Sequence, residues 1–294
     1  MSGATTFVLG YGTNGFANHD LDDALAVIAD LGYGAAALTL DHAHLNPYGA
    51  GVAARTAAVA TRLARLGLRC VVETGARYLL DRTRKHQPTL LSDDPSRRID
   101  FLVRAVAIAA DLGADCVSFW SGVPAPGLPA STAWQRLRAG VAAVLAQADR
   151  RGVRLGLEPE PGMLVAHLDD ALRVHRELGA PAALGLTLDV GHCVAIEREP
   201  AADCVRRAAP LLVNVQLDDA RPGVHEHLEF GAGDLDLVAT LAALDEVGYR
   251  GVAAVELPRH SHAAPVVARS SMVALRAALA RRQVPRRRVG VSGG

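Results

Sequence analysis

The sequence alternates short apolar runs with longer stretches of helical periodicity, and this β/α rhythm repeats eight times along the chain. The predicted strands are residues 7–11, 35–40, 69–73, 116–120, 154–158, 184–189, 212–217 and 252–257. The predicted helices are residues 20–31, 51–66, 94–112, 132–151, 168–178, 201–209, 236–247 and 265–281. Strands that alternate with helices form parallel sheets. Eight such units predict closure into a single (β/α)8 TIM barrel.

No linker separates the eight units. Four of the predicted helices stop at a glycine that leads directly into the next strand, in the motifs Leu31-Gly32-Tyr33, Leu66-Gly67-Leu68, Leu112-Gly113-Ala114 and Val247-Gly248-Tyr249. Glycine closes helices because it adopts the left-handed conformation at little cost. We therefore predict one domain over residues 1–281. Residues 282–294 are basic and then rich in Gly and Ser, which predicts a flexible tail.

The glycines after the first predicted strand allow an alternative fold. Gly10, Gly12 and Gly15 form a GxGxxG pattern, which in an open doubly wound sheet would bind a dinucleotide. In that fold the glycines open the following helix, whereas here residues 18–20 intervene. The spacing therefore favours the barrel.

The composition argues against several classes of partner. The chain has 31 basic and 31 acidic residues in 294, so it lacks the net positive charge that attracts nucleic acid or anionic membranes. Aromatic residues make up 4%, few for a base-stacking surface. The four cysteines form no CxxC pair, which is typical of a reduced, cytoplasmic protein. We also expect no signal peptide and no membrane-spanning run.

Three predicted strands end in a carboxylate. In a barrel, polar side chains at the C-terminal ends of the strands face the active-site mouth. Glu158, Asp189 and Glu256 each follow an apolar run, so we expect them to be half-buried and to converge. Buried carboxylates are unstable together without a cation. An oxygen-rich site of this kind favours Mn2+ or Mg2+, with Zn2+ or Co2+ as alternatives.

The chain resembles the xylose-isomerase-like TIM-barrel superfamily of sugar isomerases and epimerases, which also contains inosose dehydratases and apurinic endonuclease relatives. The resemblance covers nearly the whole chain and is carried by Leu155-Gly156-Leu157-Glu158-Pro159, Leu188-Asp189-Val190-Gly191-His192, Val215-Gln216-Leu217-Asp218-Asp219, Gly231-Ala232-Gly233-Asp234-Leu235-Asp236 and Ala254-Val255-Glu256-Leu257. It implies a metal held by Glu158, Asp189, position 216 and Glu256. It also implies that His192, in the Asp-x-x-His element, touches the substrate.

Position 216 departs from the family pattern, because Gln216 stands where the family has His. A Gln oxygen can ligate a hard cation but is a weaker donor than imidazole for Zn2+ or Co2+. This tilts the expectation towards Mn2+ or Mg2+ and away from the multi-zinc endonuclease branch. His225 and His227, in the following loop, are alternative sources of an imidazole. They are otherwise pocket or surface residues.

We predict further substrate contacts by His192, Glu160, Arg221, His225 and Trp120. Three of them have a structural alternative: Glu160 as an ion-paired rim residue, Trp120 as a packing residue, and Arg221 as a solvated loop residue. Glu73 is a further pocket residue, with the same alternative as Glu160. Lys85 and His86, like Arg221, lie in mouth loops where they could bind a phosphate or carboxylate or else be solvated.

The resemblance implies proton transfer next to a carbonyl, through an enediolate stabilised by the metal. Glu158 and Glu256 would remove and return the proton as catalytic base and acid. We therefore expect a metal-dependent isomerase or epimerase of a small keto-sugar or cyclitol. The same machinery can expel a β-hydroxyl, so a dehydratase or lyase is the alternative. The substrate is then a small polyol or sugar, and assembly into a homo-oligomer stays open.

Overall fold

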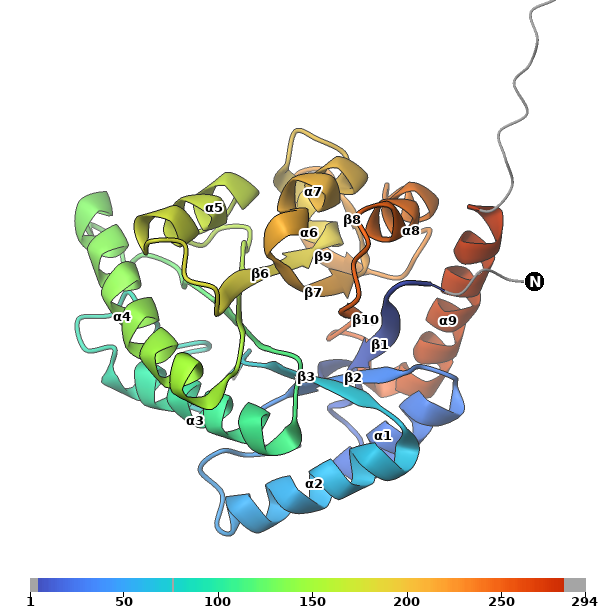
Figure 1. Cartoon of the computed structure of the whole chain (residues 1–294), viewed down its shortest axis with the longest axis horizontal. Helices are drawn as coiled ribbons and strands as arrows, with labels where there is room; N and C mark the ends of the chain where they lie inside the picture. Colours follow the sequence, from blue (N-terminus) through green and yellow to red (C-terminus); the bar gives the residue numbers. More distant parts are fainter. Residues whose placement is uncertain (1–4, 76, 283–294) are drawn as a thin grey trace, which may run out of the picture.

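The computed structural model describes residues 5–75 and 77–282. Its eight parallel strands close into one barrel in the order β1-β10-β7-β6-β5-β4-β3-β2, which confirms the predicted fold (Figure 1). The barrel strands are β1 (Val8–Gly12), β2 (Ala35–Thr39), β3 (Arg69–Glu73), β4 (Val117–Trp120), β5 (Leu155–Glu158), β6 (Leu184–Asp189), β7 (Leu212–Leu217) and β10 (Val252–Val255).

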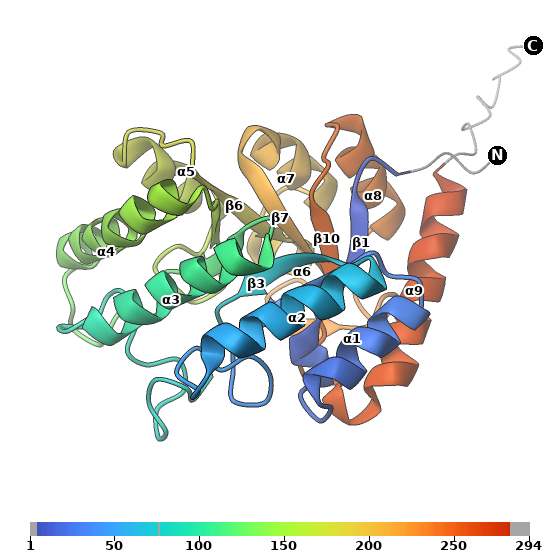
Figure 2. The same ribbon diagram turned by 60° about the horizontal axis from the view of Figure 1, so that its bottom comes forward.

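Helices surround the barrel on its outside, as the two ribbon views show (Figures 1 and 2). They are α1 (Leu21–Asp30), α2 (Val52–Leu66), α3 (Ser96–Leu112), α4 (Ala130–Arg151), α5 (Leu168–Glu177), α7 (Ala201–Ala208), α8 (Leu237–Glu246) and α9 (Ala264–Arg281). Gly67 and Gly113 end α2 and α3 in the left-handed conformation, with φ of 66° and 63°. The glycine stops read from the sequence therefore mark real helix ends. The tail predicted from residue 282 lies, from residue 283 on, outside the described residues.

The barrel interior changes from apolar to polar along the strands. One end is filled by small apolar side chains, including Ala35, Ala37 and Ala254. Further along β7, Asn214 donates from Nδ2 to Glu73 Oε1 at 3.0 Å, and both side chains are buried. Inward-facing residues in a barrel stack in layers. The layers nearest the C-terminal ends of the strands are thus built to hold polar groups.

Two elements were absent from the sequence prediction. The short helix α6 (Val190–Ile196) begins directly after β6, and Asp189 caps it by accepting from the backbone N–H of His192 at 2.9 Å. A two-stranded antiparallel hairpin, β8 (Asp219–Arg221) and β9 (Val224–Leu228), follows β7. These two elements add side chains to the mouth of the barrel from beyond the strand ends.

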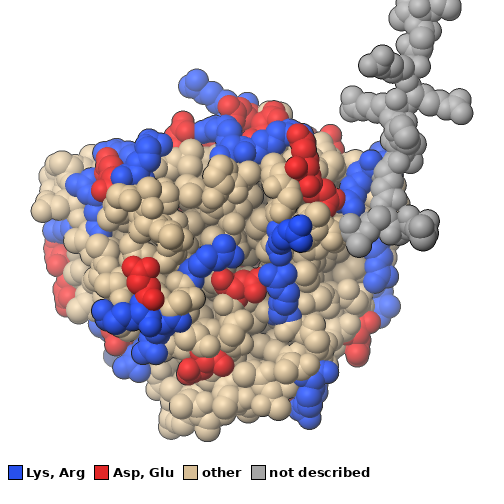
Figure 3. Space-filling view, viewed as in Figure 1, with Lys and Arg blue, Asp and Glu red and all other residues tan. Residues whose placement is uncertain are grey.

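Positive and negative side chains are interspersed over the face of the molecule shown in Figure 3, as the zero net charge would suggest. All four cysteines are buried, and none forms a disulfide. Within the described ranges, one helical segment, Ser261–Arg281, is long and apolar enough by length and composition alone to match a membrane span, a test that core helices also pass. Its inner side, with Val267, Met272 and Leu275, packs into the core of the protein.

The carboxylate of Asp219 organises the loop that follows the hairpin. It is 1% exposed and accepts hydrogen bonds from the backbone N–H groups of Ala220, Gly231, Gly233 and Leu235, at 2.8–3.1 Å. A Cβ on Gly233 would lie 2.2 Å from the Ala220 carbonyl oxygen, so this close approach requires glycine. The Gly231–Asp236 motif of the sequence is therefore explained by backbone packing around one acid.

We predict that Asp219→Ala destabilises the protein by about 3 kcal/mol, because four backbone N–H groups lose one buried acceptor at once. Denaturant unfolding measures this change. Asp234→Ala is the matched control: Asp234 is exposed in the same loop, so its loss should cost less than about 0.5 kcal/mol. Equal stabilities of the two variants would contradict the assigned role of Asp219.

Candidate metal and substrate site

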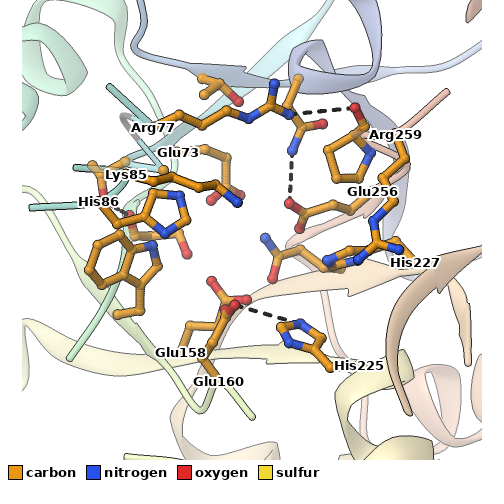
Figure 4. Close-up of a pocket in the computed structure, with 18 of the residues that line it drawn as sticks. Glu73, Arg77, Lys85, His86, Glu158, Glu160, His225, His227, Glu256 and Arg259 are labelled. Carbon is orange, nitrogen blue, oxygen red and sulfur yellow. Dashed lines mark hydrogen bonds and ion pairs between the residues drawn. The ribbon is translucent and has the colours of Figure 1, made fainter. Parts of the chain in front are cut away.

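A cavity of about 560 Å³ opens at the C-terminal mouth of the barrel (Figure 4). Carboxylates from β3, β5 and the end of β10 line it, together with residues of the loops that follow these strands. Its size falls within the usual range for small-molecule sites, about 300–1,000 Å³. The cavity is therefore large enough to hold a small molecule.

The structure brings the three predicted carboxylates together. Ligand oxygens of Glu158, Asp189 and Glu256 all lie within 4.8 Å of one another. Separations of about 4–5 Å are those of two oxygens on opposite sides of one hard divalent cation. Glu158 and Asp189 are only 5% and 1% exposed, so water cannot neutralise their charges. The arrangement has the composition and the spacing of a metal site.

Three buried oxygens of the predicted ligand set have no hydrogen-bond partner in the described part of the chain. They are Asp189 Oδ2, Gln216 Oε1 and Glu256 Oε2. Buried acceptors without partners are rare in folded proteins and call for an ion or a water. Gln216 is 3% exposed, pairs in register with Asp189, and lines the cavity. These residues therefore fit a divalent cation, and Gln216 is placed to contribute its side-chain oxygen.

The electrostatics of the cluster follow from burial. Burial raises the pKa of Glu158 well above its usual range, and the charges of Glu160 and Glu256 raise it further. Burial likewise raises the pKa of Glu256. For Asp189 burial acts in the same direction, but the nearby imidazoles of His192 and His227 outweigh it and lower the pKa. A bound cation would reverse these upward shifts, because it favours the charged carboxylates.

The β8–β9 hairpin delivers two histidines to the mouth. His227 lines the cavity, and its Nδ1 donates to Asp218 Oδ2 at 2.6 Å. The other ring nitrogen, Nε2, takes no part in this hydrogen bond. Burial alone would lower the pKa of His227, but the hydrogen bond and charge of Asp218 raise it to about 10. For His225, burial and the neighbouring imidazoles lower the pKa to about 4, so this ring is neutral.

His192 lies behind the carboxylates at 5% exposure, on α6, and is not among the residues that line the main cavity. Its Nδ1 faces the Pro159 carbonyl oxygen at 3.1 Å, which requires a proton on Nδ1. Its Nε2 lies 3.0 Å from His225 Nε2, so the two rings share one hydrogen bond. His192 thus links the β5 loop to the hairpin. Its predicted contact with substrate stays a prediction.

The other predicted substrate residues separate into two groups. Trp120, Glu160 and His225 line the cavity, and His225 Nε2 lies 3.6 Å from Glu160 Oε1. Arg221, by contrast, is exposed on the hairpin, and its Nη2 donates to the Ala232 carbonyl at 2.9 Å. Arg221 pairs with Val224 in the hairpin, and side chains alternate across a strand. Arg221 therefore lies on the face opposite His225 and His227, which line the cavity.

Sequence reasoning missed Asn14, which lines the cavity and donates from Nδ2 to Glu256 Oε1 at 2.8 Å. Asn14 lies in the glycine-rich segment just after β1, in the 3-10 turn Thr13–Phe16. Its position just after the first strand predicts a place at the mouth of the barrel, but the surrounding glycines were considered only as a possible dinucleotide-binding pattern. Asn14 fixes one oxygen of Glu256 and leaves the other free for a ligand.

The fold and this acidic mouth define a class, a (β/α)8 barrel with a cluster of carboxylates at the C-terminal ends of its strands. Residues 25–278 match the family described as the xylose isomerase-like TIM barrel, and the chain belongs to this family. An uncharacterized protein of Methanocaldococcus jannaschii is 29% identical over 115 residues, which cover 37% of this chain and 38% of that protein.

Solved structures share the fold at low sequence identity. An L-ribulose 3-epimerase is 20% identical with a TM-score of 0.76, covering 94% of this chain and 95% of that chain. A D-allulose 3-epimerase from Methylomonas sp. is 18% identical with a TM-score of 0.73, covering 95% and 100%. The IolI protein, in a structure with a bound zinc atom, is 16% identical with a TM-score of 0.74, covering 94% and 99%.

We predict that Gln216 selects the metal. Gln216→His should tighten Zn2+ binding more than Mg2+ binding, because nitrogen donors favour Zn2+. Gln216→Leu should weaken both by removing a buried oxygen. Calorimetric titration of the three proteins measures these affinities. If Gln216→Leu binds Mn2+ as tightly as the parent does, Gln216 is not a ligand.

Proposed function

We infer that this protein is a divalent-metal-dependent isomerase or epimerase that moves a proton next to the carbonyl of a small keto-sugar or cyclitol. The observation that carries this proposal is a group of buried oxygens, on Asp189, Gln216 and Glu256, that have no hydrogen-bond partner in the described part of the chain. Glu158, Gln216 and Glu256 line the cavity, and a ligand oxygen of Asp189 lies within 4.8 Å of those of Glu158 and Glu256. Such a group is costly in a protein unless a ligand uses it.

Glu158, Asp189, Gln216 and Glu256 would hold the metal, and the oxygen-rich set favours Mn2+ or Mg2+. When bound, the metal would supply positive charge that stabilises negative charge on the substrate's carbonyl and neighbouring hydroxyl oxygens. The zinc atom in the IolI protein structure supports a divalent cation in a barrel of this family. Gln216 in place of an imidazole is the reason we favour the harder cations for this chain.

Glu158 and Glu256 are the proposed proton carriers. They come from β5 and the end of β10, so they approach the cavity from different sides (Figure 4). One carboxylate would take the proton and the other would return it. Asn14 holds Glu256 Oε1, which fixes the direction of the remaining oxygen. The positions of the two acids relative to a bound substrate would decide between isomerisation and epimerisation.

The two epimerases with the same fold, acting on D-allulose and L-ribulose by their names, support a ketose as the class of substrate. The residues that line the cavity agree with this. Its floor carries carboxylate and amide groups that can accept or donate hydrogen bonds to hydroxyls, while Trp120 offers an apolar ring.

The test is solvent deuterium exchange into a panel of ketopentoses, ketohexoses and keto-cyclitols, with the Mn2+-loaded protein. We expect at least one compound to take up deuterium at the carbon next to its carbonyl without loss of water. Glu158→Gln and Glu256→Gln should each slow this exchange by about 10²–10⁴-fold, since each removes a proton carrier. Elimination of water instead would show a dehydratase.

Glu246→Gln is the matched control for these variants. Glu246 is an exposed acid on α8 that pairs with Arg206 at 2.8 Å and does not line the cavity. It should exchange at the parent rate. Circular dichroism and metal content of each variant separate a lost proton carrier from a lost fold or metal. Near-parent exchange in both Glu158→Gln and Glu256→Gln would refute the proposal.

A further inference from the structure

Charge divides the cavity into an acidic floor and a basic rim. The carboxylates Glu73 and Glu158, at strand ends, are 8% and 5% exposed. Arg77, Lys85 and Arg259 line the same cavity but lie on loops beyond the strand ends, where they are half-buried or exposed. A substrate that reaches from floor to rim therefore meets two different environments.

The loop that carries Lys85 and His86 is held in place by a buried cation. Arg98, on α3, is 2% exposed and donates to the carbonyl oxygens of Pro88 and His86, both at 2.9 Å. Its guanidinium also lies over the Trp120 ring, 4.5 Å from the centroid. His86 packs beside Trp120, with the two ring centroids 5.2 Å apart. Lys85 is thereby presented to the cavity by a fixed support.

Two of the rim cations have no acid to neutralise them in the described part of the chain. No ion pair joins Lys85 or Arg77 to a carboxylate there, and Arg77 Nη2 donates only weakly to the Pro258 carbonyl, at 3.5 Å. Arg259 differs, because its Nη1 lies 3.5 Å from Glu226 Oε1. In Figure 4, Lys85 enters the cavity from the side opposite His227, and Arg77 crosses above. These two cations are available to a ligand.

We propose that the substrate carries an anionic group, a phosphate ester or a carboxylate, which Lys85 and Arg77 bind at the rim while its carbonyl end lies on the acidic floor. This rests on the proposed function and names its class of substrate. Charge-assisted hydrogen bonds to such a group are about twice as strong as neutral ones. A neutral sugar would remove water from both cations without supplying a counter-charge, and the lost hydration of Lys85 and Arg77 would cost binding free energy.

The experiment is calorimetric binding to the full-length, Mn2+-loaded protein of matched anionic and neutral ketoses. The probes are D-ribulose 5-phosphate with D-ribulose, and D-fructuronate with D-fructose. We expect at least one anionic member to bind tenfold or more tightly than its neutral partner. The phosphate and carboxylate pairs distinguish the two sources of the anion. Lys85→Gln should remove about tenfold from the anionic affinity and leave the neutral affinity unchanged.

Arg82→Gln is the matched control, because Arg82 is an exposed cation of the same loop that does not line the cavity. It should bind the anionic probes as the parent does. Equal affinities for anionic and neutral members would overturn the proposal. So would equal losses for both members in Lys85→Gln, which would mean that Lys85 balances Glu73 instead. An anion that ligates the metal alone would bind the parent and Lys85→Gln alike, and would also overturn it.

The two proposals fail in different ways. Absence of deuterium exchange with every compound would refute the proton transfer but leave the binding preference measurable. Exchange that is as fast with neutral ketoses as with their anionic partners would refute the anionic class alone.

Discussion

Mutual repulsion of buried carboxylates is the constraint around which the mouth of this barrel is organised. Glu73, Glu158, Asp189 and Glu256 come from different strands but meet where water is largely excluded. Like charges in such a place cost several kcal/mol unless a counter-charge is present. Hydrogen bonds from Asn214 to Glu73 and from Asn14 to Glu256 offset part of that cost, and they leave other oxygens without partners.

The elements beyond the barrel strands serve the same cluster. The helix α6 begins at Asp189 and so fixes one of its oxygens, while the other stays free. The hairpin brings His227 next to Asp218, whose hydrogen bond and charge raise the pKa of this imidazole and so keep it protonated beside the acids. Asp219 in turn fixes the loop behind the hairpin through four backbone N–H groups. The cap of α6, the hairpin and the loop around Asp219 therefore all help to fix the position of the carboxylate cluster and its neighbours.

The barrel and its acidic mouth were predictable because both depend on local patterns. Alternating apolar runs define the strands, and Glu158, Asp189 and Glu256 occupy strand ends that a parallel barrel must bring to one side. The positions of His225, His227 and Arg221 were not predictable in this way. They depend on a hairpin of three- and five-residue strands, whose register decides which side chains face the cavity. Arg77 and Lys85 likewise lie on a loop whose course depends on the buried Arg98.

The central claim is that the carboxylate cluster holds one divalent cation. Anomalous diffraction from crystals of the full-length protein soaked in Mn2+ tests it most directly, because the signal locates the ion without reference to activity. We expect one strong peak about 2.0–2.6 Å from oxygens of Glu158, Asp189 and Glu256. A peak placed among His192, His225 and His227 instead, or no peak at saturating Mn2+, would contradict it.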